Sequence, residues 1–207
     1  MKLTPNLLKK LIKETIRENS MLLTEAIGRN YEDLMENLKF KDGSGTQSFA
    51  IISGQYPMGL QDVPTEEPAR SERLTQEEGL AAQMQARLDE LGLDHVQIKG
   101  RYGNPELSHV INNPDEAAIK RLCEEFQQDA YVLGENSAEP KYKMMKMEYE
   151  STPGEDGRYV ATGNSNLYPN SVATNEIVEL DENTSDYYSA IEDQNGVLRK
   201  FTFPFFS

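Results

Sequence analysis

The hydrophobic and polar positions of residues 48–133 follow strand and helix spacings in the order strand, helix, strand, strand, helix, strand. A short apolar run at 48–52, closed by a Ser-Gly pair, predicts a buried strand. The alternation at 95–99 and the return at 107–111 predict the next two strands. A last apolar run at 130–133 predicts the fourth strand.

Two helices are predicted between these strands. The first opens with a capping box from Thr75 to Glu78 and ends at Gly92. Its predicted apolar stripe consists of Leu80, Met84, Leu88 and Leu91. The second is predicted to begin with Asn113 as N-cap and Pro114 at the first helical position. Its predicted buried face consists of Ile119, Leu122, Cys123 and Phe126.

The order β-α-β-β-α-β predicts an α+β, ferredoxin-like sandwich, with two helices covering one face of an antiparallel sheet. We expect N-terminal helices before it and a β-rich extension after it. The predicted divisions are a leader helix at 1–25, a short helix and linker at 26–46, the core at 47–140 and a β-hairpin extension at 141–207.

The extension is predicted from short strand patterns. They cover residues 142–149, 159–162, 176–180, 187–191 and 198–203. Asn195-Gly196 before the last of them is a strong hairpin signal, because both residues tolerate positive φ. The Phe-rich end, with Phe203, Phe205 and Phe206, either packs over an open side of the domain or anchors a partner protein.

The core contains three motifs, Ser53-Gly54-Gln55-Tyr56-Pro57, Glu106-Leu107-Ser108-His109-Val110-Ile111 and Phe126-Gln127-Gln128-Asp129-Ala130. They resemble a bacterial and phage domain family of unknown function, whose patterns are Thr-Ala-x-Asn-Pro, Glu-x-Ser-x-x-Val and Phe-x-Gln-x-Ala. This chain has Tyr56 where the family has Asn before the proline, so a polar site built on that Asn would be lost here. The resemblance implies the fold and no particular activity.

The same motifs supply the best candidates for a catalytic site, although no residue is assigned as catalytic. The candidates are Ser53, Gln55, Tyr56, Glu106, Ser108 and Gln128. Glu106 is the one acid-base group among them, with Ser108 or Tyr56 as its hydrogen-bond partner. The alternative is that Glu106 and Ser108 satisfy backbone groups at the start of a strand.

Residues 1–20 form a basic amphipathic segment with a net charge of +3, whereas the whole chain carries −14. Its apolar stripe, the predicted partner-binding surface, includes Leu7, Leu8, Leu11 and Ile12. Such a helix can lie on a membrane surface, dock in the groove of a partner or fold back on its own acidic domain.

The leader ends in Leu23-Thr24-Glu25 before Ala26. This is similar to the cleavage signal of prohead proteases in T-even-like tailed phages, and the leader resembles their capsid-targeting peptides. The resemblance implies packaging into the phage head and cleavage between Glu25 and Ala26. An accessible, extended junction there is what a protease requires.

Composition excludes several classes of function. A net charge of −14 argues against direct binding of nucleic acid, which requires clustered Lys and Arg. A single cysteine, Cys123, excludes an internal disulfide and a cysteine zinc cluster. No apolar run is long enough to span a membrane or to act as a secretory signal, so we expect a protein of the host cytoplasm or the virion.

No cofactor is predicted. Asp181, Asn183, Ser185 and Glu192 match the oxygen spacing of an EF-hand loop. Asp186 stands where that loop requires Gly, so an acidic turn is the preferred interpretation. His95 and His109 lie on predicted strands, and we expect surface or hydrogen-bonded histidines rather than a catalytic pair.

These patterns favour a non-enzymatic tailed-phage accessory protein, head-packaged or virion-associated, that binds a viral or host protein. Two alternatives stay open: an enzyme with a site around Glu106, and an acidic inhibitor of a nucleic-acid enzyme.

Overall fold

The computed structural model describes residues 48–58, 64–102, 104–135, 141–174, 176–180, 187–192 and 197–204. Several predictions lie outside these residues. They are the leader with Leu7, Leu8, Leu11, Ile12, Glu25 and Ala26, the helix and linker at 26–46, the acidic positions Asp181, Asn183 and Ser185, and Phe205 and Phe206.

Within the described residues, nine strands form one sheet in the order β6-β5-β4-β1-β3-β2-β8-β9-β7. Every pair of neighbours in it is antiparallel. The strands are β1 (Ser48–Ser53), β2 (His95–Tyr102), β3 (Asn104–Asn112), β4 (Ala130–Glu135), β5 (Lys141–Tyr149), β6 (Ala161–Leu167), β7 (Val178–Leu180), β8 (Tyr187–Glu192) and β9 (Leu198–Thr202).

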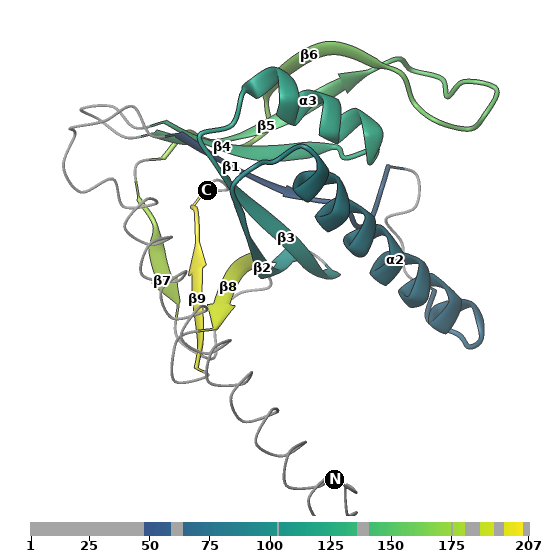
Figure 1. Ribbon diagram of the computed structural model, residues 1–207, viewed down its shortest axis with the longest axis horizontal. Helices are drawn as coiled ribbons and strands as arrows, with labels where there is room; N and C mark the ends of the chain where they lie inside the picture. The colour runs from purple at the N-terminus through teal and green to yellow at the C-terminus, as the bar shows by residue number, and fades with distance from the viewer. Residues whose placement is uncertain are drawn as a thin grey trace, which may run out of the picture.

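Two helices, α2 (Ala69–Glu90) and α3 (Glu116–Glu125), lie on the same face of this sheet (Figure 1). Strand residues alternate between the two faces, so only every second residue of β1 meets the helices. The helix-side core consists of Ala50, Ile52, Met84, Leu88, Ile111, Ile119, Leu122, Cys123, Phe126, Tyr131, Leu133 and Met147. The protein is therefore a mixed α+β structure.

The opposite face is covered by the C-terminal strands. Its helix-free-side core consists of Phe49, Ile51, Ile98, Val110, Val132, Tyr142, Ile191, Phe201 and Phe203. The Phe203 ring centroid lies 6.3 Å from that of Phe49 and 5.1 Å from that of Tyr142. Because β9 is four places from β1 in the sheet, these contacts require the sheet to curl (Figure 1).

The structure corrects the predicted start of the first helix. Helix α2 begins at Ala69 rather than at Thr75, and the Thr75 hydroxyl donates to the Ser71 carbonyl oxygen at 3.0 Å instead of capping. Its buried face consists of Arg73, Glu77, Ala81, Met84 and Leu88. Leu91 is 45% exposed, so the predicted stripe was wrong at that end.

The structure also corrects the predicted N-cap of the second helix. Asp115 is the N-cap of α3 and accepts from the Ala117 amide at 3.2 Å. Asn113 instead accepts from the Ser48 amide at 2.9 Å, which ties the approach to α3 to the start of β1. The N-cap therefore lies two residues downstream of the predicted one, and Pro114 precedes the helix.

The strand patterns of the extension correspond to β5 through β9, with ends that agree or differ by up to five residues. Strands β8 and β9 pair antiparallel from Ser189↔Phe201 to Glu192↔Leu198. The connecting Asn195-Gly196 lies outside the described residues. The extension continues the core sheet at both edges, since β5 pairs with β4 and β8 pairs with β2.

Candidate functional site

A recess of about 170 Å³ lies where the end of β1 meets the start of β3. All six candidates from the sequence motifs line it: Ser53, Gln55, Tyr56, Glu106, Ser108 and Gln128. Residues that the sequence did not single out complete its wall, including Tyr102, Asp129, Tyr131, Met144 and Tyr168. Positions far apart in the chain are brought together here because β1 pairs with β3 and β4.

Glu106 and Ser108 form the polar centre of the recess. They lie two residues apart on β3 and therefore share a face, and the Ser108 hydroxyl donates to Glu106 Oε1 at 2.9 Å. Burial of the carboxyl group raises the pKa of Glu106 to about 7, although the Ser108 hydrogen bond acts in the opposite direction. Glu106 is thus a carboxyl group that titrates near neutral pH.

Gly100 provides the space for this pair. It lies opposite Glu106 in the β2–β3 register. A Cβ atom at Gly100 would lie 3.2 Å from Glu106 Cγ and 3.3 Å from Ser108 Oγ. A side chain on β2 at this position would therefore crowd both polar groups.

The remaining serine and glutamine candidates bind the backbone around the recess. Ser53 donates to the Leu107 carbonyl oxygen at 3.2 Å, and Gln55 accepts from the Leu107 amide at 2.5 Å. Gln128 donates from Nε2 to the carbonyl oxygens of Gln55 at 3.0 Å and Phe126 at 3.2 Å. These side chains hold β1, β3 and the end of α3 together, so their role is positional.

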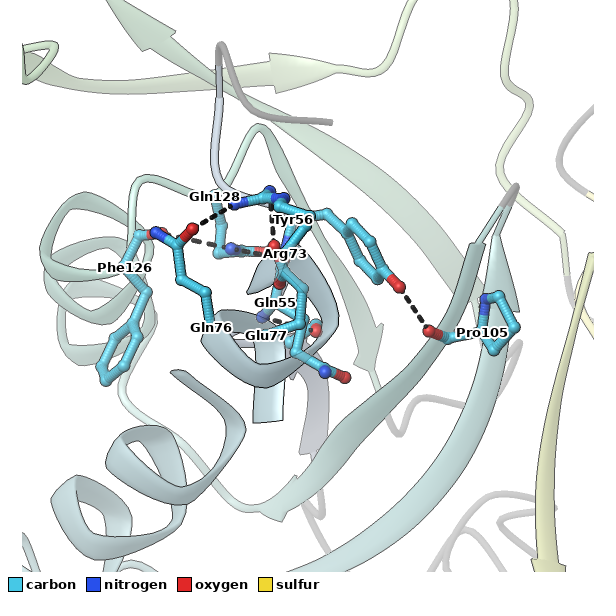
Figure 2. Close-up of polar contacts among 9 residues, drawn as sticks. Gln55, Tyr56, Arg73, Gln76, Glu77, Pro105, Phe126 and Gln128 are labelled. Atoms are coloured by element: carbon cyan, nitrogen blue, oxygen red, sulfur yellow. Dashed lines mark hydrogen bonds and ion pairs between the residues drawn. The ribbon is translucent and has the colours of Figure 1, made fainter. Parts of the chain in front are cut away.

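Tyr56 follows β1 with a positive φ of 52°, which is uncommon for a residue with a side chain. Its hydroxyl donates to the Pro105 carbonyl oxygen at 2.9 Å, and its amide donates to Glu77 Oε2 at 2.6 Å (Figure 2). Both contacts fix the turn at the mouth of the recess. Burial, and after it the charge of Glu77, raises the pKa of the Tyr56 hydroxyl.

A buried ion pair behind Tyr56 is a feature that sequence reasoning missed. Arg73 and Glu77 are one helical turn apart on α2, and their side chains are 7% and 2% exposed. Arg73 Nη1 also donates to Gln76 Oε1 at 3.1 Å (Figure 2). The i, i+4 spacing of opposite charges was the available signal, but it is indistinguishable from a solvent-exposed pair in sequence.

Tyr102 and Ser189 were also missed. Their hydroxyl oxygens lie 2.8 Å apart, and they join β2 to β8 beside Glu106. Burial raises the pKa of Tyr102 to about 12, so the phenol stays protonated at neutral pH. No local motif marks either residue, because the contact depends on a strand pair separated by 87 positions.

The two histidines lie apart from this recess and close to each other. Their Nδ1 atoms are 3.3 Å apart, and His95 Nε2 lies 3.2 Å from Asp89 Oδ1. His109 is 0% exposed, and its Nε2 has no hydrogen-bond partner among the described residues. Burial, and then the charge of His95, lowers the pKa of His109 to about 4. His109 is therefore a core histidine that stays neutral at pH 7.

The other predicted positions are placed as follows. Phe203 is 5% exposed and packs in the helix-free-side core, so it is not an exposed anchor. Cys123 is fully buried, as predicted, and burial raises the pKa of its thiol. The backbone of Glu192 belongs to β8.

Neither a metal centre nor a membrane span is found in the part of the chain that the structure describes. No group of three or more His, Cys, Asp or Glu side chains there could hold a metal ion. None of its helices combines the length and the apolar character that crossing a membrane requires.

Comparison with known proteins assigns no family. No protein-family model matches the chain, and a search of curated proteins finds no significant match. The resemblance of the three core motifs to a phage and bacterial domain family therefore stays a prediction.

Proposed function

We propose that this protein acts by binding rather than by catalysis, and that the Glu106 recess is a ligand site of its folded part. The supporting observation is that the polar groups around Glu106 are already engaged. Ser53, Gln55 and Gln128 bind backbone groups of neighbouring segments, and the Tyr56 hydroxyl binds Pro105. Such groups build a fixed receptor wall, and none of them is arranged as a nucleophile with a base.

We further propose that β1 to β4 with α2 and α3 form a ferredoxin-like unit, to which β5 to β9 are added. The strand order β4-β1-β3-β2 with antiparallel neighbours supports this, as does the position of both helices on one face. An experimental structure in which α2 and α3 lie on opposite faces would contradict it.

The biological context that we propose is a tailed-phage accessory protein, carried in the head or attached to the virion, that binds a viral or host protein. The supporting observation is the basic segment 1–20 of net charge +3, which is followed by Leu23-Thr24-Glu25 and joined to an acidic body. Mass spectrometry of the protein from purified particles tests this. An N-terminus at Ala26 is the expected result, and an intact leader in mature particles would count against packaging with cleavage.

An enzyme is the second candidate, favoured by the Glu106–Ser108 pair. A carboxyl group with a pKa of about 7 is suited to general acid-base catalysis at neutral pH. In that case, Glu106→Gln abolishes turnover of any substrate found, and the wild-type rate changes with an apparent pKa near 7. A variant that retains full activity would reject Glu106 as the catalytic group.

A further inference from the structure

We propose that the recess binds an alkylammonium group, with the Glu106 carboxylate as its anionic partner and tyrosine side chains as its wall. This inference rests on the proposal that the recess is a ligand site, and it specifies the chemistry of the ligand. A primary ammonium group on a short carbon chain has this chemistry, whether it belongs to a lysine side chain or to a free diamine.

The charge around Glu106 is the first argument. Among the described residues, no Lys or Arg lies within ion-pair distance of its carboxylate, and the Ser108 hydroxyl that donates to it is neutral. Arg73, a buried cation on α2, is paired with Glu77. Within the part of the chain that the structure describes, ionised Glu106 is therefore a partly buried anion without a counter-ion, and an incoming cation supplies one.

The aromatic wall is the second argument. Tyr56, Tyr102, Tyr131 and Tyr168 all line the recess, and the faces of tyrosine rings attract ammonium groups. Hydrogen bonds to Pro105 and Ser189 restrain Tyr56 and Tyr102. The wall is therefore largely formed before a ligand arrives, which lowers the entropic cost of binding.

The protein already uses this chemistry at one side of the recess. Lys146 Nζ lies 3.8 Å from Asp129 Oδ1 and 5.7 Å from the centroid of the Tyr168 ring. Asp129 and Tyr168 both line the recess, so an ammonium group held by a carboxylate and a tyrosine ring is present there. Glu106 with Tyr102 offers a second carboxylate and phenol without such a cation.

The size of the recess limits the ligand. Its volume of about 170 Å³ is close to the ~150 Å³ of an apolar protein cavity that binds benzene. A butylammonium group is of this size, whereas a folded peptide or a nucleotide is far larger. A ligand with a larger body would place only its ammonium arm in the recess.

The test is a titration of the full chain with butylammonium chloride at pH 8 and 150 mM salt. Binding is measured from the NMR shifts of the Gly100 and Ser108 amide signals. Neutral 1-butanol is the ligand control. The protein variants are Glu106→Gln, which keeps the shape of the side chain, and Glu155→Gln, which removes an exposed carboxylate elsewhere. This second variant controls for general attraction of cations to an acidic protein.

We expect saturable shifts with butylammonium and no shifts with 1-butanol. The affinity for butylammonium should fall at least tenfold in Glu106→Gln and should stay unchanged in Glu155→Gln. Wild-type affinity should also fall at least threefold from pH 8 to pH 6, as Glu106 becomes protonated. The ionisable groups that interact with Glu106 are Glu77 from α2, Tyr102 from β2 and Tyr56 after β1. None of the three has an ordinary pKa between 6 and 8.

Two further ligands separate the possible sources of the ammonium group, the amide of Nα-acetyl-lysine and 1,4-diaminobutane. Tighter binding of the lysine derivative supports a protein ligand, and tighter binding of the diamine supports a free polyamine. Equal affinity of wild type and Glu106→Gln, or no shift with any ammonium compound, would overturn the inference. The broader proposal of a partner protein is tested separately, by the N-terminus found in particles.

Discussion

Arg73 and Glu77 form an ion pair on the buried face of α2, one turn apart and almost completely shielded from water. Glu77 Oε2 also accepts from the Tyr56 amide, so the same carboxylate fixes the turn after β1. The pair therefore connects a helix to the mouth of the recess, although it lies in a segment whose sequence reads as polar surface.

Removal of one partner should be strongly destabilising. Glu77→Ala leaves Arg73 as a buried charge and the Tyr56 amide without its acceptor, which costs about 3–5 kcal/mol of unfolding free energy. Urea unfolding at pH 7 measures this loss. The matched control is Glu90→Ala, which breaks the pair with Arg87 on the same helix, where the side chains are 33% and 70% exposed. It should cost below about 1 kcal/mol, and equal losses in both variants would contradict the argument.

Glu106 should make the protein less stable as pH rises through neutrality. Its pKa is raised to about 7 in the folded protein, from an ordinary value of 4.5. Between these values the folded state binds more protons than the unfolded state, so unfolding free energy falls with increasing pH, by at most ~3 kcal/mol. Glu106→Gln should therefore stabilise the protein at pH 8 and have little effect at pH 4.5. A variant less stable than wild type at pH 8 would show that ionised Glu106 is structural.

His109 should have the opposite effect. Its pKa is lowered to about 4 from an ordinary value of 6.5, so the unfolded state binds the extra proton in this range. Stability is present above pH 6.5 and is lost as pH falls towards 4, by at most ~3 kcal/mol. In His109→Leu this loss should disappear, whatever the absolute stability of the variant. Unfolding midpoints in urea at pH 4.5 and pH 7 measure it, and an unchanged pH slope would count against the assignment.

The close approach of β1 to α2 should make Gly54 intolerant of a side chain. A Cβ atom there would lie 2.7 Å from Met84 Cβ and 3.0 Å from the Leu80 carbonyl oxygen. Gly54→Ala should cost about 1–3 kcal/mol, because backbone and helix must shift apart. Gly79→Ala is the control on the exposed side of α2, where a Cβ atom meets nothing within 4 Å. It should stabilise by about 1 kcal/mol, and thermal unfolding should separate the two variants in sign.

The opposing effects of Glu106 and His109 have a joint consequence for measurement. Their titration ranges overlap between about pH 4.5 and 6.5, where one slope is negative and the other positive. The wild-type stability curve should therefore be flatter there than that of either single variant. Stability curves of Glu106→Gln and His109→Leu therefore give the separate contributions of the two groups to the unfolding free energy, which partly cancel in the wild-type curve.

The hydrophobic pattern determined much of the core from sequence alone. Four strands and two helices were predicted in their observed order, because alternation and 3.6-residue periodicity directly reflect which residues face a core. The buried residues Ile119, Leu122 and Cys123 were predicted for the same reason. The polar candidates were found from short motifs, and the fold brings all six of them to one recess.

Tertiary structure decided what the local pattern could not encode. Residues 69–74 are helical and Arg73 is buried against Glu77, whereas the sequence of this stretch is polar and does not indicate a buried face. Tyr102 and Ser189 meet because β8 pairs with β2, and Gly100 matters only through the residue opposite it in β3. Periodicity indicates whether a side chain is buried. Strand pairing determines which other buried side chains this side chain contacts. That pairing depends on residues far apart in the chain.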